Sequence, residues 1–471
     1  MSHGRRDFLK YAGAAAAFGI IGLRRKSANA RVPVDPVSVL VLDFTGGWNV
    51  HASFAARTHP SVNPHGVYTG KDTGVVRASN LLFRERDQLL SLDSSAWGMR
   101  IPGFEDAARE FSTIGAMRHS LSYTADDHPP SARSMGTGYM DRVDVPGLGT
   151  VIGRYAPQGT KAPPAMIIDP GLSSAEMGRA PGAWQPYAPL SLVHTALPVS
   201  GNQKLTWTES ERTSDDESRR PRRGLGALQI DTLRRYKEAF HGYRQFFLDD
   251  AIATADPQKA TARYASGLLG ARSPTTQQLR EALGGAGYED EAALALAFRC
   301  LEGGSRFVAV GCGLSYSPYG HDMHTDEEGG YELYVRDAQL LAGISFLLKQ
   351  FGLEKKVLVV AVSEMARSYT ATMYNAAHGT DHGHIGLSSP KGMPGSTRQT
   401  VLLAHGPIAA RREAYPADPE YGDPVGAPCI TAELLAMLAE CAGVERENHP
   451  WSDSPDGVPL SADALAKALI A

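Results

Sequence analysis

Five short runs of valine, leucine, isoleucine and alanine constrain the fold of this chain more than any other feature. They read SVLVLDF (38–44), AMIID (165–169), RFVAVG (306–311), KVLVVAVS (356–363) and TVLLAHG (400–406). Their apolar residues do not alternate with polar ones, as they would in a strand with one face in water. Such runs are typical of strands buried on both faces, as in a mostly parallel sheet covered by helices.

Helical patterns separate these runs. YELYVRDAQLLAGISFLLKQFG (331–352) lies between the third and fourth runs, and the order of elements over residues 293–364 predicts a βαβ unit. Residues 226–300 are mainly helical in pattern, and the charged segment 208–224 is typical of a surface loop. We therefore predict a single three-layer α/β/α domain over residues 31–471, with a helical insertion.

The first 30 residues have the pattern of an export signal. Arg5 and Arg6 precede an apolar stretch from Tyr11 to Leu23, and an A-x-A pattern ends at Ala30. The pattern predicts a twin-arginine signal peptide, hence export by that machinery to the periplasm or cell envelope. The stretch is shorter than the roughly 20 residues of a membrane-spanning helix, so we expect no stable membrane span after cleavage. An uncleaved anchor is the alternative.

Charge and cysteine content exclude two classes of protein. The formal net charge is −4, and the first 30 residues carry +5, which leaves −9 for the rest. Nucleic-acid binding needs a basic face, so we expect none. The four cysteines make no dense disulfide framework; Cys429 and Cys441 flank a helical pattern about 18 Å long, and Cys300 and Cys312 are predicted to be buried thiols.

Acidic and histidine side chains gather where the apolar runs end or shortly after: Asp43, His119 (after FSTIGAM), Asp322, His324, Glu364 and His405. In open α/β sheets, ligands bind outside the carboxyl ends of the strands. We therefore predict that these side chains meet at one edge of the sheet.

The spacing of these groups predicts a metal site. Asp322 and His324, like His382 and His384, are two residues apart, so in an extended segment each pair points the same way. Imidazole with carboxylate suits zinc, manganese or iron, whereas acids alone suit calcium or magnesium. We expect one or two divalent ions (zinc, manganese or calcium). The candidate ligands are Asp43, Asp322, His324, Glu364, Asp381, His382 and His384, although each residue alone also fits a surface position, and Asp43 a helix cap.

The segment DDHPPSARSMGTGYM (126–140) is typical of a tight loop that enters a helix. His128 is a candidate catalytic residue, as a ligand, a general base or a nucleophile. Ser131 is either a nucleophile or the helix N-cap, and the cap is favoured. Arg367 follows Glu364 by three residues and either holds an anionic substrate or pairs with a neighbouring acid.

Several of these motifs, in this order, resemble the domain of unknown function 1501 family: GRRDFLK, LVLDFTGGWN, HPPSARSMGTGY, GLGTVIGRY, CLEGGSRFVAV, HDMHTDEE, VSEMAR and GTDHGH. Those proteins are exported by the twin-arginine route and are distantly similar to sulfatases and alkaline phosphatases. The resemblance implies an alkaline-phosphatase-like core, with Asp43, Asp322, His324, Glu364, Asp381 and His382 as metal ligands. Where sulfatases carry a nucleophilic cysteine or serine, this chain has His128, and the arginine of that motif is displaced by one, to Arg133.

Together these features predict an exported metal-dependent hydrolase of phosphate or sulfate esters without the usual nucleophile, in which His128 and Arg367 act on the substrate. The substrate would be a small anion or an anionic polymer. A non-enzymatic envelope or surface protein that keeps the fold, and a structural metal, is the alternative. A third hypothesis is a protein that binds an anionic polymer.

Overall fold

All five apolar runs are strands of one sheet, as predicted. The structure, a computed structural model, describes residues 35–48, 107, 109–120, 128–156, 162–192, 291–312, 321, 327–365, 399–416, 424–452 and 462–470. The five runs form β1 (Ser38–Asp43), β3 (Ala165–Ile168), β5 (Phe307–Gly311), β6 (Val357–Val362) and β7 (Gln399–Ala404). The sheet also contains four strands outside those runs, β2 (Phe111–Arg118), β4 (Leu190–Leu192), β8 (Glu413–Ala414) and β9 (Cys429–Ile430).

Strand direction decides which ends share an edge of the sheet. The order is β4-β3-β5-β1-β6-β7-β2-β8, and β9 also pairs with β2. The strands from β4 to β6 are parallel, whereas β7 is antiparallel to both β6 and β2. The carboxyl ends of β1, β3, β5, β6 and β2 therefore lie along one edge, which we call the carboxyl edge, and β7 ends at the opposite edge.

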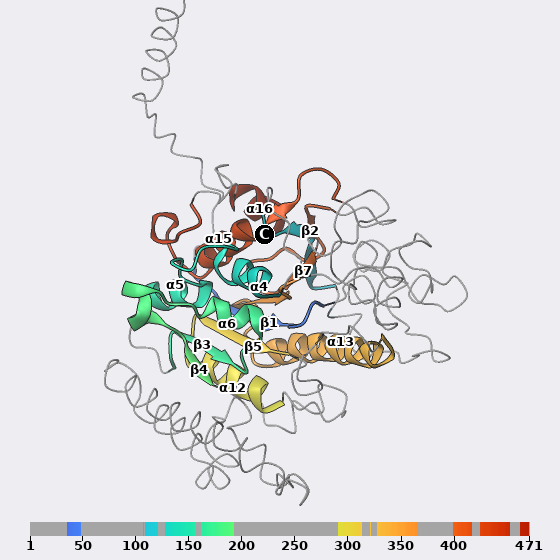
Figure 1. The fold of residues 1–471 in the computed structure, drawn as a ribbon. Coiled ribbons are helices and arrows are strands. Elements are labelled where there is room, and N and C mark those ends of the chain that lie inside the picture. The colour runs from blue at the N-terminus through green and yellow to red at the C-terminus, as the bar shows by residue number, and fades with distance from the viewer. Residues whose placement is uncertain are drawn as a thin grey trace, which may run out of the picture.

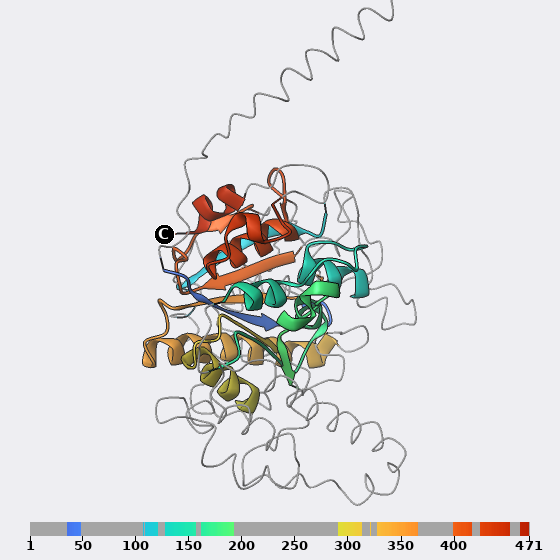
Figure 2. The ribbon, with the colours of Figure 1, turned by 90° about the vertical axis from the view of Figure 1, so that its left-hand side faces the viewer.

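Helices cover both faces of this sheet (Figures 1 and 2). One face carries α4 (His128–Thr137), α5 (Leu148–Tyr155), α6 (Leu172–Met177) and α15 (Thr431–Cys441), and the other carries α12 (Glu291–Glu302) and α13 (Glu327–Gln350). The 3-10 helices η2 (Gly182–Tyr187) and η5 (Arg446–Asn448) and the helix α16 (Ala462–Leu469) complete the described elements. The predicted three-layer α/β arrangement is present, and β5, α13 and β6 form the predicted βαβ unit with β1 between the two strands.

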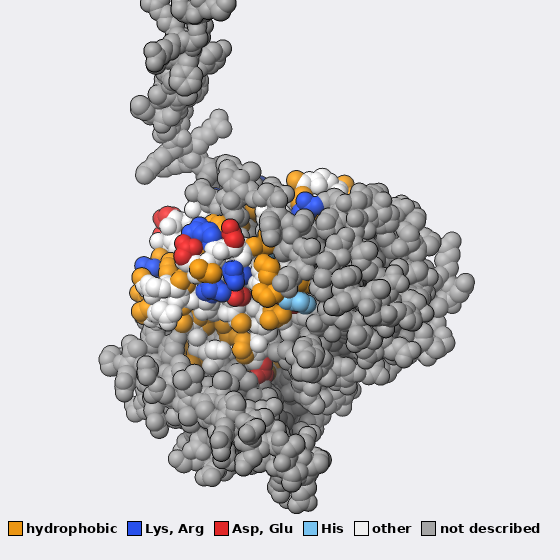
Figure 3. Space-filling view, viewed as in Figure 1, with side chains coloured by type: hydrophobic (Ala, Val, Ile, Leu, Met, Phe, Trp, Pro, Cys, Tyr) orange, Lys and Arg blue, Asp and Glu red, His pale blue; other side chains and the backbone are white. Residues whose placement is uncertain are grey.

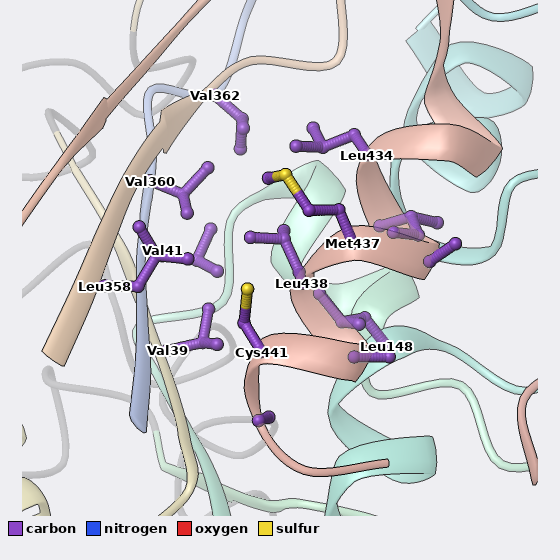
Figure 4. Packing of buried hydrophobic residues seen from close by; sticks show 14 of the residues in the cluster. Val39, Val41, Leu148, Leu358, Val360, Val362, Leu434, Met437, Leu438 and Cys441 are labelled. Carbon is purple, nitrogen blue, oxygen red and sulfur yellow. The ribbon is translucent and has the colours of Figure 1, made fainter. Parts of the chain in front are cut away.

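The core forms because alternate residues of each strand point to opposite faces. Val39 and Val41 of β1 and Val360 of β6 point toward Leu434 and Leu438 of α15 (Figure 4). All five side chains are buried, and burying a valine or leucine side chain contributes roughly 1.5–3 kcal/mol. The intervening strand residues face the second helical layer, which explains why the runs are apolar at every position.

The cysteines support this packing as thiols. All four lie among the described residues, are buried and form no disulfide. Cys300 of α12 places its Sγ 3.0 Å from Sδ of Met166 in β3, on the face opposite α15.

The described surface mixes charges of both signs. In Figure 3, basic and acidic side chains lie close together over the visible described face rather than in separate patches. Within the described parts of the chain, we find no helix with both the length and the apolar character needed to cross a membrane.

Candidate active site

Asp43 is the last residue of β1 and is fully buried. Its Oδ2 accepts a hydrogen bond of 2.7 Å from the backbone N–H of Ser174, near the start of α6, so it also caps that helix from a distant segment. Gly171 makes this approach possible, because a Cβ atom there would lie 2.5 Å from Oδ2. The other carboxylate oxygen, Oδ1, is buried and accepts no hydrogen bond from any residue that the structure describes.

Glu364 lies two residues beyond the end of β6 and is also fully buried. Its Oε1 accepts hydrogen bonds from the backbone N–H of Gly46 (2.7 Å) and from Nδ1 of His128 (2.8 Å). Its Oε2 accepts one of 3.2 Å from the Ser363 hydroxyl. These contacts fix the orientation of the carboxylate.

His128 is the first residue of α4, and its side chain is 18% exposed. An ionised carboxylate only accepts hydrogen bonds, so the contact with Glu364 places the proton of the neutral ring on Nδ1 and leaves the lone pair on Nε2. Ser131 is not the helix N-cap, as favoured from the sequence, because α4 already begins at His128. Pro129 and Pro130 suit the first turn, where a backbone N–H has no partner within the helix. The Ser131 hydroxyl is buried and has no partner among the described residues.

The charge of Glu364 destabilises the anionic form of Asp43. Burial raises the pKa of Asp43 to about 7, and the charge of Glu364 adds to that shift, while the hydrogen bonds from Ser174 and the charge of His321 oppose it. Two carboxylates in one buried region, one of them with an unused acceptor oxygen, fit a bound cation. Within the described residues, however, no group of three or more His, Cys, Asp or Glu side chains could hold a metal ion, so a full ligand set would need further residues.

A second buried pair lies on the α13 side of the carboxyl edge and was not predicted from the sequence. His321 Nε2 and Asp337 Oδ2 are 2.8 Å apart, and neither side chain is exposed. The helical pattern did carry a signal for Asp337. It precedes Leu340, Leu341 and Ile344 at the spacing that places an acid on the buried face of α13.

The two remaining histidines at strand ends lie at opposite edges. His119 follows β2 at the carboxyl edge, as predicted, and burial lowers its pKa to about 4 against the opposing effects of the Glu364 backbone and charge. The prediction that His405 shares this edge is wrong. His405 follows the antiparallel strand β7 and bonds Ser345 of α13 at 3.0 Å, and its neighbour Gly406 bonds the carbonyl of Glu354, which precedes β6.

Of the nine predicted site residues, the structure places Glu364 and His128 in contact and Asp43 at the same edge, within the field of Glu364. The others lie outside the described residues and remain predictions: Asp322, His324, Arg367, Asp381, His382 and His384.

Comparisons with known proteins identify a family and only weak structural likeness. The family model described as "Protein of unknown function (DUF1501)" matches residues 94–389. No curated protein matches the chain. Similar solved structures include Ps i-CgsB in complex with k-i-k-neocarrahexaose, at 11% identity with a TM-score of 0.36, covering 87% of this chain and 72% of that one.

Two further structures resemble the chain to a similar degree. The lipoteichoic acid synthase LtaP from Listeria monocytogenes is 9% identical with a TM-score of 0.35, covering 92% of this chain and 76% of that one. A structure titled as part of glycosaminoglycan metabolism by Bacteroides thetaiotaomicron (BT33494S-sulf) is 12% identical with a TM-score of 0.37, covering 88% and 75% respectively. With TM-scores below 0.5, this likeness decides neither activity nor substrate.

Proposed function

The chain belongs to the DUF1501 family, and from that premise we propose that it is an exported, metal-dependent hydrolase of phosphate or sulfate esters. One observation carries the proposal: Asp43 and Glu364 are both fully buried at the carboxyl edge, and Asp43 Oδ1 accepts no hydrogen bond from the described residues. A purely structural pair of this kind would be costly, because burying charges without compensation costs several kcal/mol.

The described residues fit a divalent cation as the compensating charge. Asp43 and Glu364 would hold it, and the ligands predicted from the sequence would complete the shell: Asp322, His324, Asp381, His382 and His384. When bound, the cation supplies positive charge to the oxygens of an anionic ester. Imidazole among the ligands favours zinc or manganese over calcium.

His128 is the residue best placed to move a proton. Glu364 holds Nδ1, so the lone pair on Nε2 of the neutral ring can take a proton from an attacking water, as in other oriented imidazole bases. The side chain is 18% exposed, although the Nε2 atom itself is buried. With His128 as the base, water attacks the ester directly, so no covalent intermediate forms. This route suits a chain in which an imidazole replaces the hydroxyl or thiol nucleophile of the sulfatases. Arg367 would bind the charge of the ester, which is a small anion or an anionic polymer.

The same replacement at His128 supports a second candidate, a non-enzymatic envelope protein that keeps a structural metal. In that protein the metal would have no open coordination position. The twin-arginine pattern predicted in residues 1–30 supports export of either protein to the periplasm or cell envelope.

A metal analysis and an ester panel on the mature chain test the proposal. We expect bound zinc or manganese in the purified protein and hydrolysis of p-nitrophenyl phosphate or p-nitrophenyl sulfate. We expect Asp43→Asn and His382→Ala to reduce both the bound metal and the rate of hydrolysis. The control His405→Gln, at the opposite edge, should change neither quantity. Wild-type protein without metal, or unchanged hydrolysis in His382→Ala, would refute the proposal; metal without hydrolysis would favour the structural role.

A further inference from the structure

We propose that Asp337 and His321 are a positioning pair that sets the orientation of Glu364, and through it of His128. The inference rests on the proposed function, because it concerns the same site. Neither residue is a predicted ligand, and both lie on the α13 side of the sheet. They would act on the site through the turn that follows β1.

The pair is the buried anchor of this arrangement. The 2.8 Å contact between His321 Nε2 and Asp337 Oδ2 has both side chains fully out of solvent. Burial raises the pKa of Asp337, while the charge and the hydrogen bond of His321 oppose that shift. A buried carboxylate that is hydrogen-bonded to a buried ring has little freedom to move, since losing that bond leaves its charge uncompensated.

Two aromatic rings connect the anchor to the end of β1. The His321 ring meets Phe44 edge-on, with centroids 5.2 Å apart, and Phe44 stacks on Trp48 at 4.5 Å. The backbone N–H of His321 also donates to the carbonyl of Thr45 at 2.6 Å. Side-chain packing and a backbone hydrogen bond therefore both hold the turn at residues 45–47.

The turn at residues 45–47 holds Glu364 in place. The Gly46 N–H donates to Glu364 Oε1, the same oxygen that His128 contacts. The Trp48 N–H donates to the Ser363 hydroxyl at 3.0 Å, and that hydroxyl donates to Oε2. Both carboxylate oxygens of Glu364 are thus bonded by groups that depend on the turn or on its anchor. A shift of the turn would rotate the carboxylate and move Nδ1 of His128 with it.

Zinc affinity of the metal-depleted full chain, measured by competition with a fluorescent chelator, tests the inference. Partners that orient a ligating carboxylate typically contribute about 10- to 100-fold to metal affinity. We expect losses of that size in Asp337→Asn and His321→Gln. We expect a smaller loss in Trp48→Phe, which keeps an aromatic ring against Phe44 but reduces the stacked area. The control is His405→Gln, a similarly buried histidine with one side-chain partner at the opposite edge; it should change affinity less than about 2-fold.

A double-mutant cycle separates positioning from general destabilisation. If Asp337 acts through Glu364, Asp337→Asn should cost less than about 3-fold in a Glu364→Gln background. An equal loss in both backgrounds would overturn the inference, as would wild-type affinity in folded Asp337→Asn, His321→Gln and Trp48→Phe. Those results would leave the proposed function standing, whereas wild-type protein that binds no zinc or manganese would remove both.

Discussion

Replacing Asp43 by asparagine should stabilise the metal-free protein, although Asp43 is central to the proposed site. The carboxylate is fully buried and lies in the field of Glu364. Asparagine has nearly the same shape and keeps one oxygen to accept the Ser174 N–H. It removes the buried charge, which no described residue compensates at Oδ1.

The magnitude follows from the pKa of Asp43, which burial and Glu364 raise from 3.8 to about 7. A carboxyl group with a raised pKa in the folded state favours folding while it is protonated, and that stability is lost as the pH rises from about 4 to about 7. Each unit of pKa difference corresponds to about 1.4 kcal/mol, so the full effect is about 4 kcal/mol at pH 8. Allowing for relaxation around the charge, we expect Asp43→Asn to raise the free energy of unfolding by about 2–4 kcal/mol at pH 8, and by almost nothing near pH 4.

Urea unfolding of chelator-treated wild-type and Asp43→Asn protein, at several pH values from 4.5 to 8, measures this difference. The comparison cancels the titration of other groups, such as His119. Adding zinc should reverse the order at pH 8, because a ligand that binds only the folded state stabilises it and Asp43→Asn should bind zinc weakly. A difference that does not grow with pH, or a less stable Asp43→Asn at pH 8 without metal, would refute the account of Asp43 as an uncompensated buried charge.

Three further predictions address separate parts of the fold and site. Burial lowers the pKa of His405 to about 4, so the stability that the neutral His405 contributes is lost as the pH falls from about 6.5 to about 4. In urea unfolding, His405→Gln should therefore lose about 2 kcal/mol less stability than the wild type over this pH range. An unchanged dependence of the unfolding free energy on pH would contradict this prediction. Gly171→Ala should weaken zinc affinity more than 10-fold, because the new Cβ would lie 2.5 Å from Asp43 Oδ2. Wild-type affinity in the chelator assay would show that α6 shifts to accommodate the methyl group and leaves Asp43 in place. His128→Ala should lower ester hydrolysis roughly 10²- to 10⁴-fold with less effect on zinc affinity, and an equal loss of both would make His128 a ligand rather than a base.

The sequence predicted the central strands because they are buried on both faces, and such strands are apolar at every position. It did not include β2 among the apolar runs, because FSTIGAMR contains Ser112 and Thr113. These residues are buried, and Ser112 Oγ donates to the carbonyl of Ala409, a partner far along the chain that the local pattern does not reveal. The error at His405 has a different cause: apolar composition shows that a strand is buried but not which way it runs.

Within the site, the sequence predicted the residues that end apolar runs and missed those that support them. Asp43 and Glu364 stand out because each acid comes at the end of an apolar run. Ser174 contacts Asp43 across 131 positions, and His321 meets Asp337 only after α13 has packed on the sheet. These supporting contacts form only when distant parts of the chain pack together, so the spacing of residues in the sequence does not predict them.

The placement of the two carboxylates follows from the same alternation that builds the core. On β1, Val39 and Val41 face the layer that contains α15, and the next residue on that face is Asp43. On β6, Val360 faces the same layer, and Glu364 continues its alternation past the end of the strand. The period of the strands therefore delivers both acids to one face at one edge, where the start of α4 brings His128 into contact with Glu364. Shifting either strand by one residue would turn its acid toward α12 and α13, so the register that buries the valines also determines whether this site can exist.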